Sequence, residues 1–270
     1  MQKIRLDQRV FDLGLAESRE KAKALIMAGA VYVDGEKQTK PGAAVADTAD
    51  VAVKGSKLKY VSRGGLKLEK ALDHFAIDPA GYMCVDCGAS TGGFTDCLLQ
   101  RGAKHVFAVD VGYGQLAWSL RNDERVTVME RVNARSLTPD MFPGPFDMAV
   151  MDMSFISLRL VLPAVKSLLI EEGGQVVCLV KPQFEAGREK VGKKGVVRDP
   201  AVHREVLERF VEDAAAMGFF LRGMTFSPIR GPEGNIEYLA WLCTSGPAVE
   251  VDCAEIVRQS HASLEKTGED

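Results

Sequence analysis

The chain has 270 residues, enough for one large domain or for a small domain followed by a medium one. Hydrophobic residues make up 46% and charged residues 26%, as in a globular protein with a sizeable core, and no apolar run approaches the roughly 18 residues of a membrane span. The formal net charge of −3 does not by itself indicate a nucleic-acid binder.

The first 60 residues are predicted to form a small α+β domain. Apolar residues at helical spacing predict a first helix that Gly14 ends, and Ser18 is placed to cap a second helix that ends at Gly29. Residues 31–33 are a predicted strand before a tight turn, and short strands are expected to follow over residues 36–60.

Residues 61–65 are predicted to be a linker, because Ser-Arg-Gly-Gly is suited to a hinge. In residues 66–250, near-continuous apolar runs alternate with helical patterns, which is typical of a parallel sheet buried on both faces. The prediction is a doubly wound, Rossmann-like α/β domain, followed over 251–270 by a C-terminal helix and an acidic tail. The strands are expected at 83–86, 106–110, 126–130, 148–153, 176–181, 219–226 and 236–243.

The basic residues are concentrated at the N-terminus. Of the 34 basic and 37 acidic residues, residues 1–63 hold 12 and 8, a net of +4, which leaves a net of −7 on the rest. Such an imbalance suggests a phosphate-binding module, although a solvated basic face would give the same numbers. The N-terminus lacks the apolar segment of a signal peptide, and the six cysteines lie in apolar stretches, so we expect a cytoplasmic protein with reduced thiols.

Over about residues 4–55, the sequence resembles the alpha-L RNA-binding domain of the S-four type. The pattern consists of Leu-Asp-x-x-Val from residue 6, Gly-Leu-Ala-x-Ser-Arg from residue 14 and Gly-x-Val-x-Val-Asp-Gly from residue 29. The resemblance implies a basic surface that faces RNA, although each cation could simply point to solvent. The predicted RNA-binding residues are Arg5, Arg9, Arg19, Lys21 and Lys23, with Arg63 and, in a basic Gly-rich loop, Arg188.

A glycine-rich turn follows the first predicted strand of the larger domain and opens a helix. Glycines let the backbone approach a ligand, and Asp110, which ends the next strand, could accept the hydroxyls of an adenosine ribose. A nicotinamide dinucleotide would need G-x-G-x-x-G, from which this turn departs, so S-adenosylmethionine is the predicted cofactor, with a turn that binds nothing as the alternative. The predicted cofactor residues are Asp86, Gly88, Ser90, Gly92, Gly93, Phe94, Asp110, Asn133 and Asp152.

Four apolar strands each end on a charged residue. Ligands of open α/β sheets bind beyond the carboxyl ends of the strands, so a shared site is favoured over four unrelated surface charges. These residues are Asp86, Asp110, Asp152 and Lys181.

Longer motifs resemble the TlyA family over nearly the whole chain. They include Ser-Arg-Gly-Gly-x-Lys-Leu from residue 62, Asp-x-Ser-Phe-Ile-Ser from residue 152, Val-Lys-Pro-Gln-Phe-Glu from residue 180 and Gly-Pro-x-Gly-Asn-x-Glu-Tyr from residue 231. The resemblance implies an FtsJ-like methyltransferase domain that methylates the ribose 2′-hydroxyl of cytidine in ribosomal RNA, with ribosomal RNA or ribosomal subunits as partners. The family's catalytic set falls on Lys67, Asp152, Lys181 and Glu237.

A ribose 2′-hydroxyl is a very weak acid, so its methylation calls for a general base. A lysine can take this part where a neighbouring cation and low dielectric favour its neutral form, and Lys181 is the predicted base. Lys67 is expected to favour that neutral form, Asp152 to orient Lys181, and Glu237 to hold the lysines or the ribose.

Two other functions are alternatives to RNA methylation. Some members of the family are named hemolysins, but a membrane-lytic protein is disfavoured because the sequence has no signal peptide, membrane span or strongly amphipathic surface helix. An RNA-binding protein with an inactive methyltransferase domain is disfavoured by the intact catalytic set. Cys84 and Cys87 are expected to be core thiols, no metal site is predicted, and Tyr113 and Trp118 are left between stacking on adenine or RNA and core packing.

Overall fold

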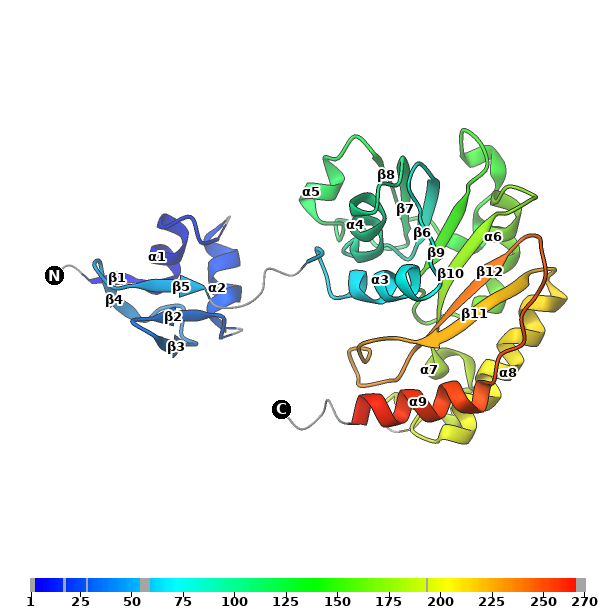
Figure 1. Ribbon diagram of the computed structural model, residues 1–270. Coiled ribbons are helices and arrows are strands. Elements are labelled where there is room, and N and C mark those ends of the chain that lie inside the picture. Colours follow the sequence, from blue (N-terminus) through cyan, green and yellow to red (C-terminus); the bar gives the residue numbers. More distant parts are fainter. Residues whose placement is uncertain (1–2, 17, 28, 54–58, 193, 266–270) are drawn as a thin grey trace. The chain divides into compact units, whose positions relative to one another are not determined.

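The computed structural model describes residues 3–16, 18–27, 29–53, 59–192 and 194–265. The chain divides into two compact units, Met1–Lys57 and Leu58–Asp270 (Figure 1).

The N-terminal unit is an α+β fold, as predicted. Ser18 accepts a hydrogen bond from the backbone N–H of Lys21 (3.2 Å), and Gly29, with φ of +69°, follows the second helix. One antiparallel sheet has the order β3-β2-β5, and β1 pairs with β4. The elements are β1 (Lys3–Arg5), α1 (Leu6–Asp12), α2 (Arg19–Met27), β2 (Val31–Val33), β3 (Glu36–Gln38), β4 (Ala44–Ala46) and β5 (Val51–Val53).

The larger unit is built on a seven-stranded sheet with the order β11-β12-β10-β9-β6-β7-β8. The first five of the seven predicted strands are parallel, as expected, whereas β12 runs antiparallel to both β10 and β11. The strands are β6 (Met83–Cys87), β7 (His105–Asp110), β8 (Val126–Glu130), β9 (Met148–Met151), β10 (Gln175–Val180), β11 (Phe220–Phe226) and β12 (Tyr238–Cys243). The α-helices are α3 (Gly64–His74), α4 (Gly93–Gln100), α5 (Trp118–Arg121), α6 (Leu162–Leu168), α7 (Pro182–Glu185), α8 (Pro200–Ala216) and α9 (Cys253–Glu265).

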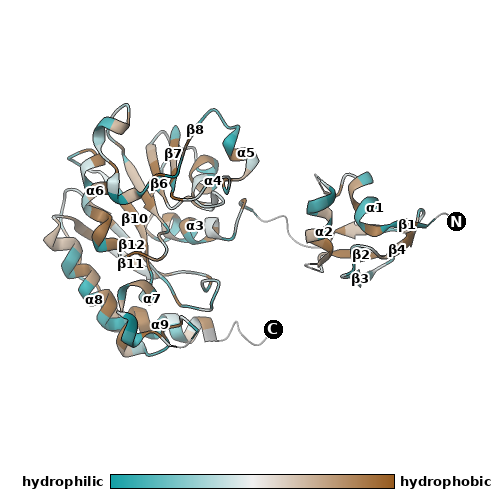
Figure 2. Ribbon diagram, turned by 180° about the vertical axis from the view of Figure 1, so that it is seen from behind, coloured by the Kyte–Doolittle hydropathy of each residue, from teal (hydrophilic) through white to brown (hydrophobic). Residues whose placement is uncertain are grey.

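The central strands β9 and β10 are buried on both faces, which explains why they are apolar along almost their whole length (Figure 2). Successive residues point to opposite faces: Met148 and Val150 of β9 pack in one core cluster, and Ala149 and Met151 in the other. Helices α3 and α4 contribute to the first cluster, and α6, α8 and α9 to the second. This is the layered architecture expected of a doubly wound sheet.

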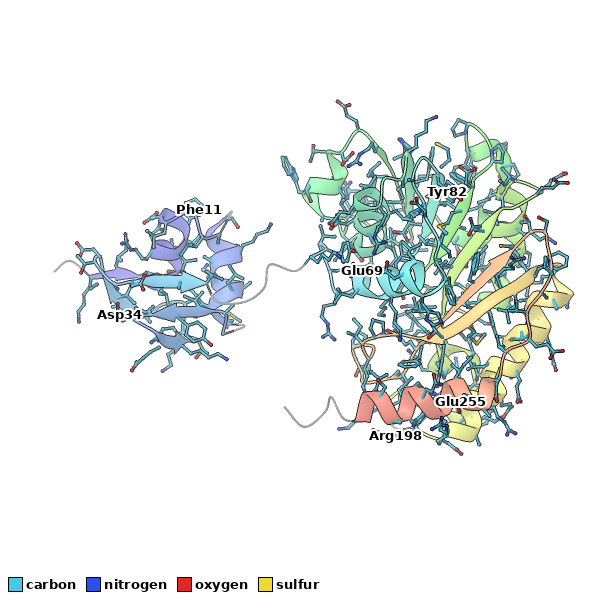
Figure 3. All side chains as sticks on the ribbon, in the orientation of Figure 1. Phe11, Asp34, Glu69, Tyr82, Arg198 and Glu255 are labelled. Atoms are coloured by element: carbon cyan, nitrogen blue, oxygen red, sulfur yellow. The ribbon has the colours of Figure 1, made fainter. Side chains whose placement is uncertain are left out.

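The predicted linker at residues 61–65 is wrong, because these residues are part of the larger unit. The backbone N–H of Val61 donates to Asp96 (2.7 Å), and Glu69, which lies on α3 (Figure 3), forms ion pairs with Lys59 and Arg101. Helix α3 already begins at Gly64. The two glycines that suggested a hinge instead allow close packing at the start of this helix. Of the range 36–60 in which short strands were predicted, residues 54–58 lie outside the described residues.

Candidate active site

Four charged side chains meet at the carboxyl edge of the parallel strands: Lys67, Asp152, Lys181 and Glu237. Asp152 follows β9 and Lys181 follows β10, and these neighbouring parallel strands end at the same edge. Glu237 precedes β12, and since β12 runs antiparallel to β10, it starts at that edge. Lys67 reaches the group from α3. Strand direction therefore gathers residues that are as many as 170 positions apart in the sequence.

Asp152 bridges the two lysines. Lys181 Nζ lies 2.5 Å from Asp152 Oδ1, and Lys67 Nζ lies 3.7 Å from Asp152 Oδ2 and 2.6 Å from Glu237 Oε2. The exposed side-chain fraction is 1% for Glu237, 8% for each lysine and 22% for Asp152. Two positive and two negative groups balance each other, which is how buried charges are tolerated.

Two further polar side chains contact this cluster, and the sequence motifs did not single out either of them. Ser154 Oγ accepts a hydrogen bond from Lys181 Nζ (3.2 Å), and Gln183 Nε2 donates to Glu237 Oε1 (3.4 Å). Both lie inside motifs that were noted for other residues. Their contacts depend on how the segments after β9 and β10 pack in the folded protein. A local sequence pattern does not encode this packing.

Gly231 allows a tight turn to approach the Glu237 carboxylate. A Cβ atom at position 231 would lie 2.7 Å from Glu237 Oε1, closer than real side chains allow. The turn is closed by two backbone hydrogen bonds, from Gly231 N to Asn235 O and from Gly234 N to Gly231 O, both 2.9 Å. The glycine in this motif is therefore required by packing against the charged cluster.

A cavity of about 360 Å³ opens beside the cluster, within the size range of small-molecule sites. Gly93 begins α4 and packs against the start of α3, where a Cβ atom at position 93 would lie 2.3 Å from Ser62 Oγ. Gly92 has φ of +95° and packs toward α5 rather than into the cavity. The predicted cofactor residues that line the cavity are Gly88, Ser90, Gly93, Phe94 and Asp152. Lys67 and Lys181 of the charged cluster line it as well.

A second cavity, of about 320 Å³, shares Gly88, Ser90 and Asp152 with the first and extends to Asp110. Asp110 Oδ2 accepts a hydrogen bond from Ser90 N (2.8 Å), and Asp110 Oδ1 accepts one from Gly112 N (2.7 Å). These bonds fix the Asp110 carboxylate at the end of β7, where the prediction placed it.

Asn133, one of the predicted cofactor residues, caps a short helix in the structure. Its side chain accepts a hydrogen bond from Arg135 N (3.0 Å) and so caps a short 3₁₀ helix (Ala134–Ser136). Its neighbours Val132 and Ala134 line the second cavity instead. Because the cap uses only the amide oxygen of Asn133, its contact with the cofactor stays a prediction.

Asp86 is fully buried beneath the glycine-rich turn. Its Oδ2 accepts hydrogen bonds from the backbone and hydroxyl of Thr95 (2.9 and 2.7 Å), and its Oδ1 has no hydrogen-bond partner among the described residues. Burial, reinforced by the nearby Asp152, raises the pKa of Asp86 to about 7, and the Thr95 bonds only partly oppose this. Asp86 is not among the residues that line either cavity, so its unpartnered oxygen lies below the cavity floor formed by the turn.

Tyr113 and Trp118 are exposed at 68% and 78%, which excludes the core packing that the sequence left open. The guanidinium of Arg131 lies 4.4 Å from the centroid of the Tyr113 ring. Both aromatic side chains are therefore available for contacts with a ligand or partner.

Cys84 and Cys87 are buried free thiols, like the other four cysteines. Burial raises the pKa of both thiols well above its usual range, which makes them unreactive. Among the described residues, no three His, Cys, Asp or Glu side chains are grouped so as to hold a metal ion.

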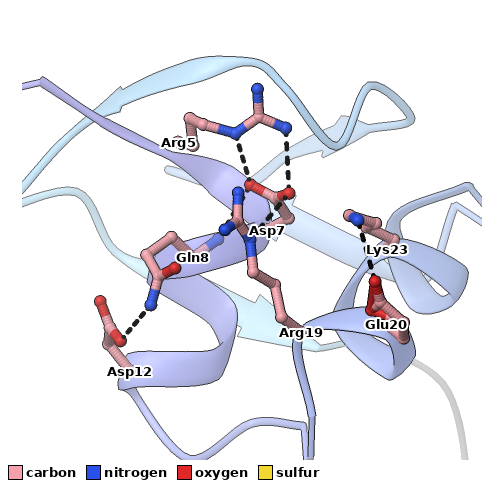
Figure 4. Close-up of polar contacts among 7 residues, drawn as sticks. All are labelled: Arg5, Asp7, Gln8, Asp12, Arg19, Glu20 and Lys23. Carbon is pink, nitrogen blue, oxygen red and sulfur yellow. Dashed lines mark hydrogen bonds and ion pairs between the residues drawn. The ribbon is translucent and has the colours of Figure 1, made fainter.

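In the N-terminal unit, two of the predicted RNA-binding residues converge on a buried acid. Arg5 donates to both carboxylate oxygens of Asp7 (3.0 Å each), and Arg19 Nε lies 3.3 Å from Asp7 Oδ2 (Figure 4). The Arg5 guanidinium holds the pKa of Asp7 below its usual range. Both arginines stay about half exposed, so Asp7 orients them at the surface, while Lys23 pairs with Glu20.

The remaining predicted RNA-binding residues are divided between the two units. Arg9 lies on α1 and Lys21 on α2. Arg63 precedes α3 and lines the first cavity, and Arg188 starts a 3₁₀ helix (Arg188–Lys190) in the basic loop after α7. One residue of that loop, Lys193, is outside the described part of the chain.

Comparisons with known proteins identify both units. The FtsJ-like methyltransferase model matches residues 60–244, and the S4 domain model matches residues 4–51. A Mycobacterium tuberculosis protein named 16S/23S rRNA (cytidine-2′-O)-methyltransferase TlyA is 51% identical over 243 residues, which are 90% of each chain. The protein named Hemolysin A from Brachyspira hyodysenteriae is 44% identical, over 88% of this chain and 98% of its own.

A solved structure shares this architecture. It belongs to a provisionally named hemolysin of Streptococcus thermophilus, with 49% sequence identity, a TM-score of 0.79 and full coverage of both chains.

Proposed function

This chain belongs to the FtsJ-like methyltransferase family and contains an S4 domain, and we propose that it transfers a methyl group from S-adenosylmethionine to a cytidine 2′-hydroxyl of ribosomal RNA. The family confirms the methyltransferase fold that the motifs predicted, and the TlyA relative confirms the resemblance to that family. The single observation that supports the chemistry is the buried group of two lysines and two carboxylates at the mouth of the glycine-lined cavity.

Lys181 is the proposed general base. Lys181 Nζ forms an ion pair with Asp152 Oδ1 (2.5 Å) and donates a hydrogen bond to Ser154 Oγ (3.2 Å), and these two contacts hold the amine beside the cavity. After the ammonium group has lost one proton, its lone pair can accept the proton from the ribose 2′-oxygen. Lys67 stabilises the negative charge that develops on that oxygen, and Glu237 holds Lys67 in place at 2.6 Å.

The residues around the two cavities fit S-adenosylmethionine. The unpartnered Oδ1 of Asp86 suits the cationic amino-acid end, and Asp110, which lines the second cavity, suits the ribose hydroxyls. When bound, this cofactor supplies an electrophilic methyl group on a sulfonium. The protein's part is to hold donor and acceptor in line and to exclude water, which accounts for much of the rate acceleration in such reactions.

The S4 domain and its exposed arginines support an RNA partner, because guanidinium groups pair with phosphates. The Brachyspira relative carries the name of a hemolysin, and a membrane-active protein is the competing hypothesis. No helix among the described residues is long and apolar enough to cross a membrane. Release of dye from liposomes by the purified protein, with no methyl transfer to RNA, would favour the competing hypothesis.

The proposed function predicts methylated cytidines in ribosomal RNA that depend on this protein. Sites of 2′-O-methylation resist alkaline cleavage, so they can be mapped in RNA from cells with and without the gene. We expect one or more cytidines to lose protection in the deletion strain and to regain it when ribosomal subunits are incubated with the purified protein and S-adenosylmethionine. Identical maps in the two strains and no incorporation in vitro would refute the function.

Cofactor affinity is expected to fall as the pH is lowered through about 7. Because the pKa of Asp86 is raised to about 7, the carboxyl is neutral below this pH and must lose its proton to face a cationic ligand. Asp86→Asn is expected to bind S-adenosylmethionine roughly tenfold or more weakly at high pH, since a charge-assisted hydrogen bond is lost. Isothermal titration over this pH range measures both effects.

The same Asp86→Asn variant controls for titration of the cofactor itself. Its affinity should lack the step near pH 7 that the wild-type protein shows. If both proteins show the same dependence on pH, Asp86 is not the responsible group.

A further inference from the structure

The two segments that carry the proposed base and its orienting acid run side by side. One segment follows β9 and begins with Asp152, and the other follows β10, begins with Lys181 and continues as α7. The ion pair of 2.5 Å joins their first residues. Three residues further along each segment, the rings of Phe155 and Phe184 lie 5.2 Å apart.

Glu185, the last residue of α7, closes this pairing at its far end. Its Oε2 accepts a hydrogen bond from Ser157 Oγ (2.6 Å), and its Oε1 accepts one from the backbone N–H of Leu158 (2.8 Å). Its own backbone carbonyl accepts a hydrogen bond from Arg209 of α8. Both carboxylate oxygens therefore bind the segment after β9, while the main chain is anchored to a long helix.

The segment after β9 needs an external support of this kind. Between Asp152 and the 3₁₀ helix at Leu158–Leu160 it has no regular secondary structure, and Phe155 has a left-handed φ of +63°. A non-glycine residue in this region is strained and persists only where surrounding contacts hold it. The ring contact and the two bonds from Glu185 are contacts that can do so.

We propose that Glu185 is a positioning residue that sets the distance and direction between Asp152 and Lys181 by binding the far end of the strained segment, at Ser157 and Leu158. Glu185 does not line the cavity beside Lys67, so it acts through the loop rather than on the substrate. The inference rests on the proposed function, because it concerns the orientation of the general base of that reaction.

The first test separates turnover from binding. Glu185→Ala removes both accepted hydrogen bonds and is expected to lower kcat by about 10²-fold, as displacements near 1 Å do. The dissociation constant for S-adenosylmethionine should stay close to that of the wild type, since the glycine-rich turn is unchanged. Glu255→Ala is a matched control, because that carboxylate pairs with Arg258 on the surface of α9 (Figure 3).

A conservative variant distinguishes hydrogen bonding from charge. In Glu185→Gln, one amide oxygen can still accept from Leu158 N, and the amide nitrogen can donate to the hydroxyl of Ser157, so most of the activity should return. Wild-type kcat in Glu185→Ala would overturn the proposal, as would Glu185→Gln being as inactive as the alanine variant. If Glu185→Ala does not fold, Ser157→Ala, which loses one bond, should show the same loss of kcat at a smaller size.

A crystal structure of Glu185→Ala tests the geometry without any turnover. We expect the Asp152–Lys181 pair to be separated beyond ion-pair distance while the rest of the sheet is unchanged. An intact pair would overturn the positioning role. This readout also distinguishes the two hypotheses, since a wild-type protein that fails to methylate RNA refutes the proposed function but leaves the structural result in place.

Discussion

Replacing Lys181 by alanine is expected to reduce methyl transfer by about 10³-fold while leaving the affinity for S-adenosylmethionine nearly unchanged. The amine is the proposed acceptor of the 2′-hydroxyl proton, and both of its described partners, Asp152 and Ser154, remain in the variant. Single-turnover transfer of a labelled methyl group to ribosomal RNA measures the rate, and isothermal titration measures the cofactor affinity.

The variant Lys181→Arg tests whether the reaction needs a base at position 181 or only a positive charge. Arginine keeps the cation and can still pair with Asp152, but it stays protonated in proteins and has no lone pair to offer. We expect this variant to be as inactive as Lys181→Ala. Near-normal turnover in either variant would exclude Lys181 as the base, and turnover restored by arginine alone would make it an electrostatic group instead.

Replacing Lys67 by methionine is expected to lower the free energy of unfolding by about 3–5 kcal/mol, because it leaves Glu237 buried without its cation. For a unit of this size, such a loss corresponds to a fall in Tm of roughly 10 °C. Activity should be lost as well, since Lys67 contacts both Glu237 and Asp152. Thermal unfolding followed by circular dichroism measures the change in stability.

The double variant Lys67→Met/Glu237→Gln is the matched control. Removing both charges takes away the unpaired carboxylate, so most of the lost stability should return while the enzyme stays inactive. Lys70→Ala, one turn along α3, removes a lysine that lies over the Phe226 ring rather than in the cluster, and should keep its activity. A single Lys67→Met variant as stable as the wild type would show that the Glu237 charge is compensated by another group.

Much of the fold follows from local sequence patterns. Near-continuous apolar runs predicted the five parallel strands, because a strand buried on both faces has no polar side to show. Ser18 and Gly29 predicted the limits of α2, because capping depends only on neighbouring residues. Asp152 and Lys181 were predicted to lie at the carboxyl edge of the sheet because each directly follows a strand.

Other features could not be read in this way. The two glycines before Leu66 suggested a hinge, yet they lie in and before a packed helix, because a glycine serves close packing as well as flexibility. The capping of a 3₁₀ helix by the Asn133 side chain was not predicted, although it depends on neighbouring residues. Lys67 and Glu237 entered the catalytic set only through the family resemblance.

What the sequence by itself determined is therefore the strands of the larger sheet, the first two helices, the approximate limits of these elements and the two residues that follow β9 and β10, because these depend on local periodicity and capping. What only the tertiary structure decided is which side chains meet: the pairing of Lys67 with Glu237 across 170 residues, the partnerless oxygen of Asp86 and the bonds from Glu185. The physical reason is that such contacts depend on strand order, strand direction and the packing of loops, which no local pattern encodes.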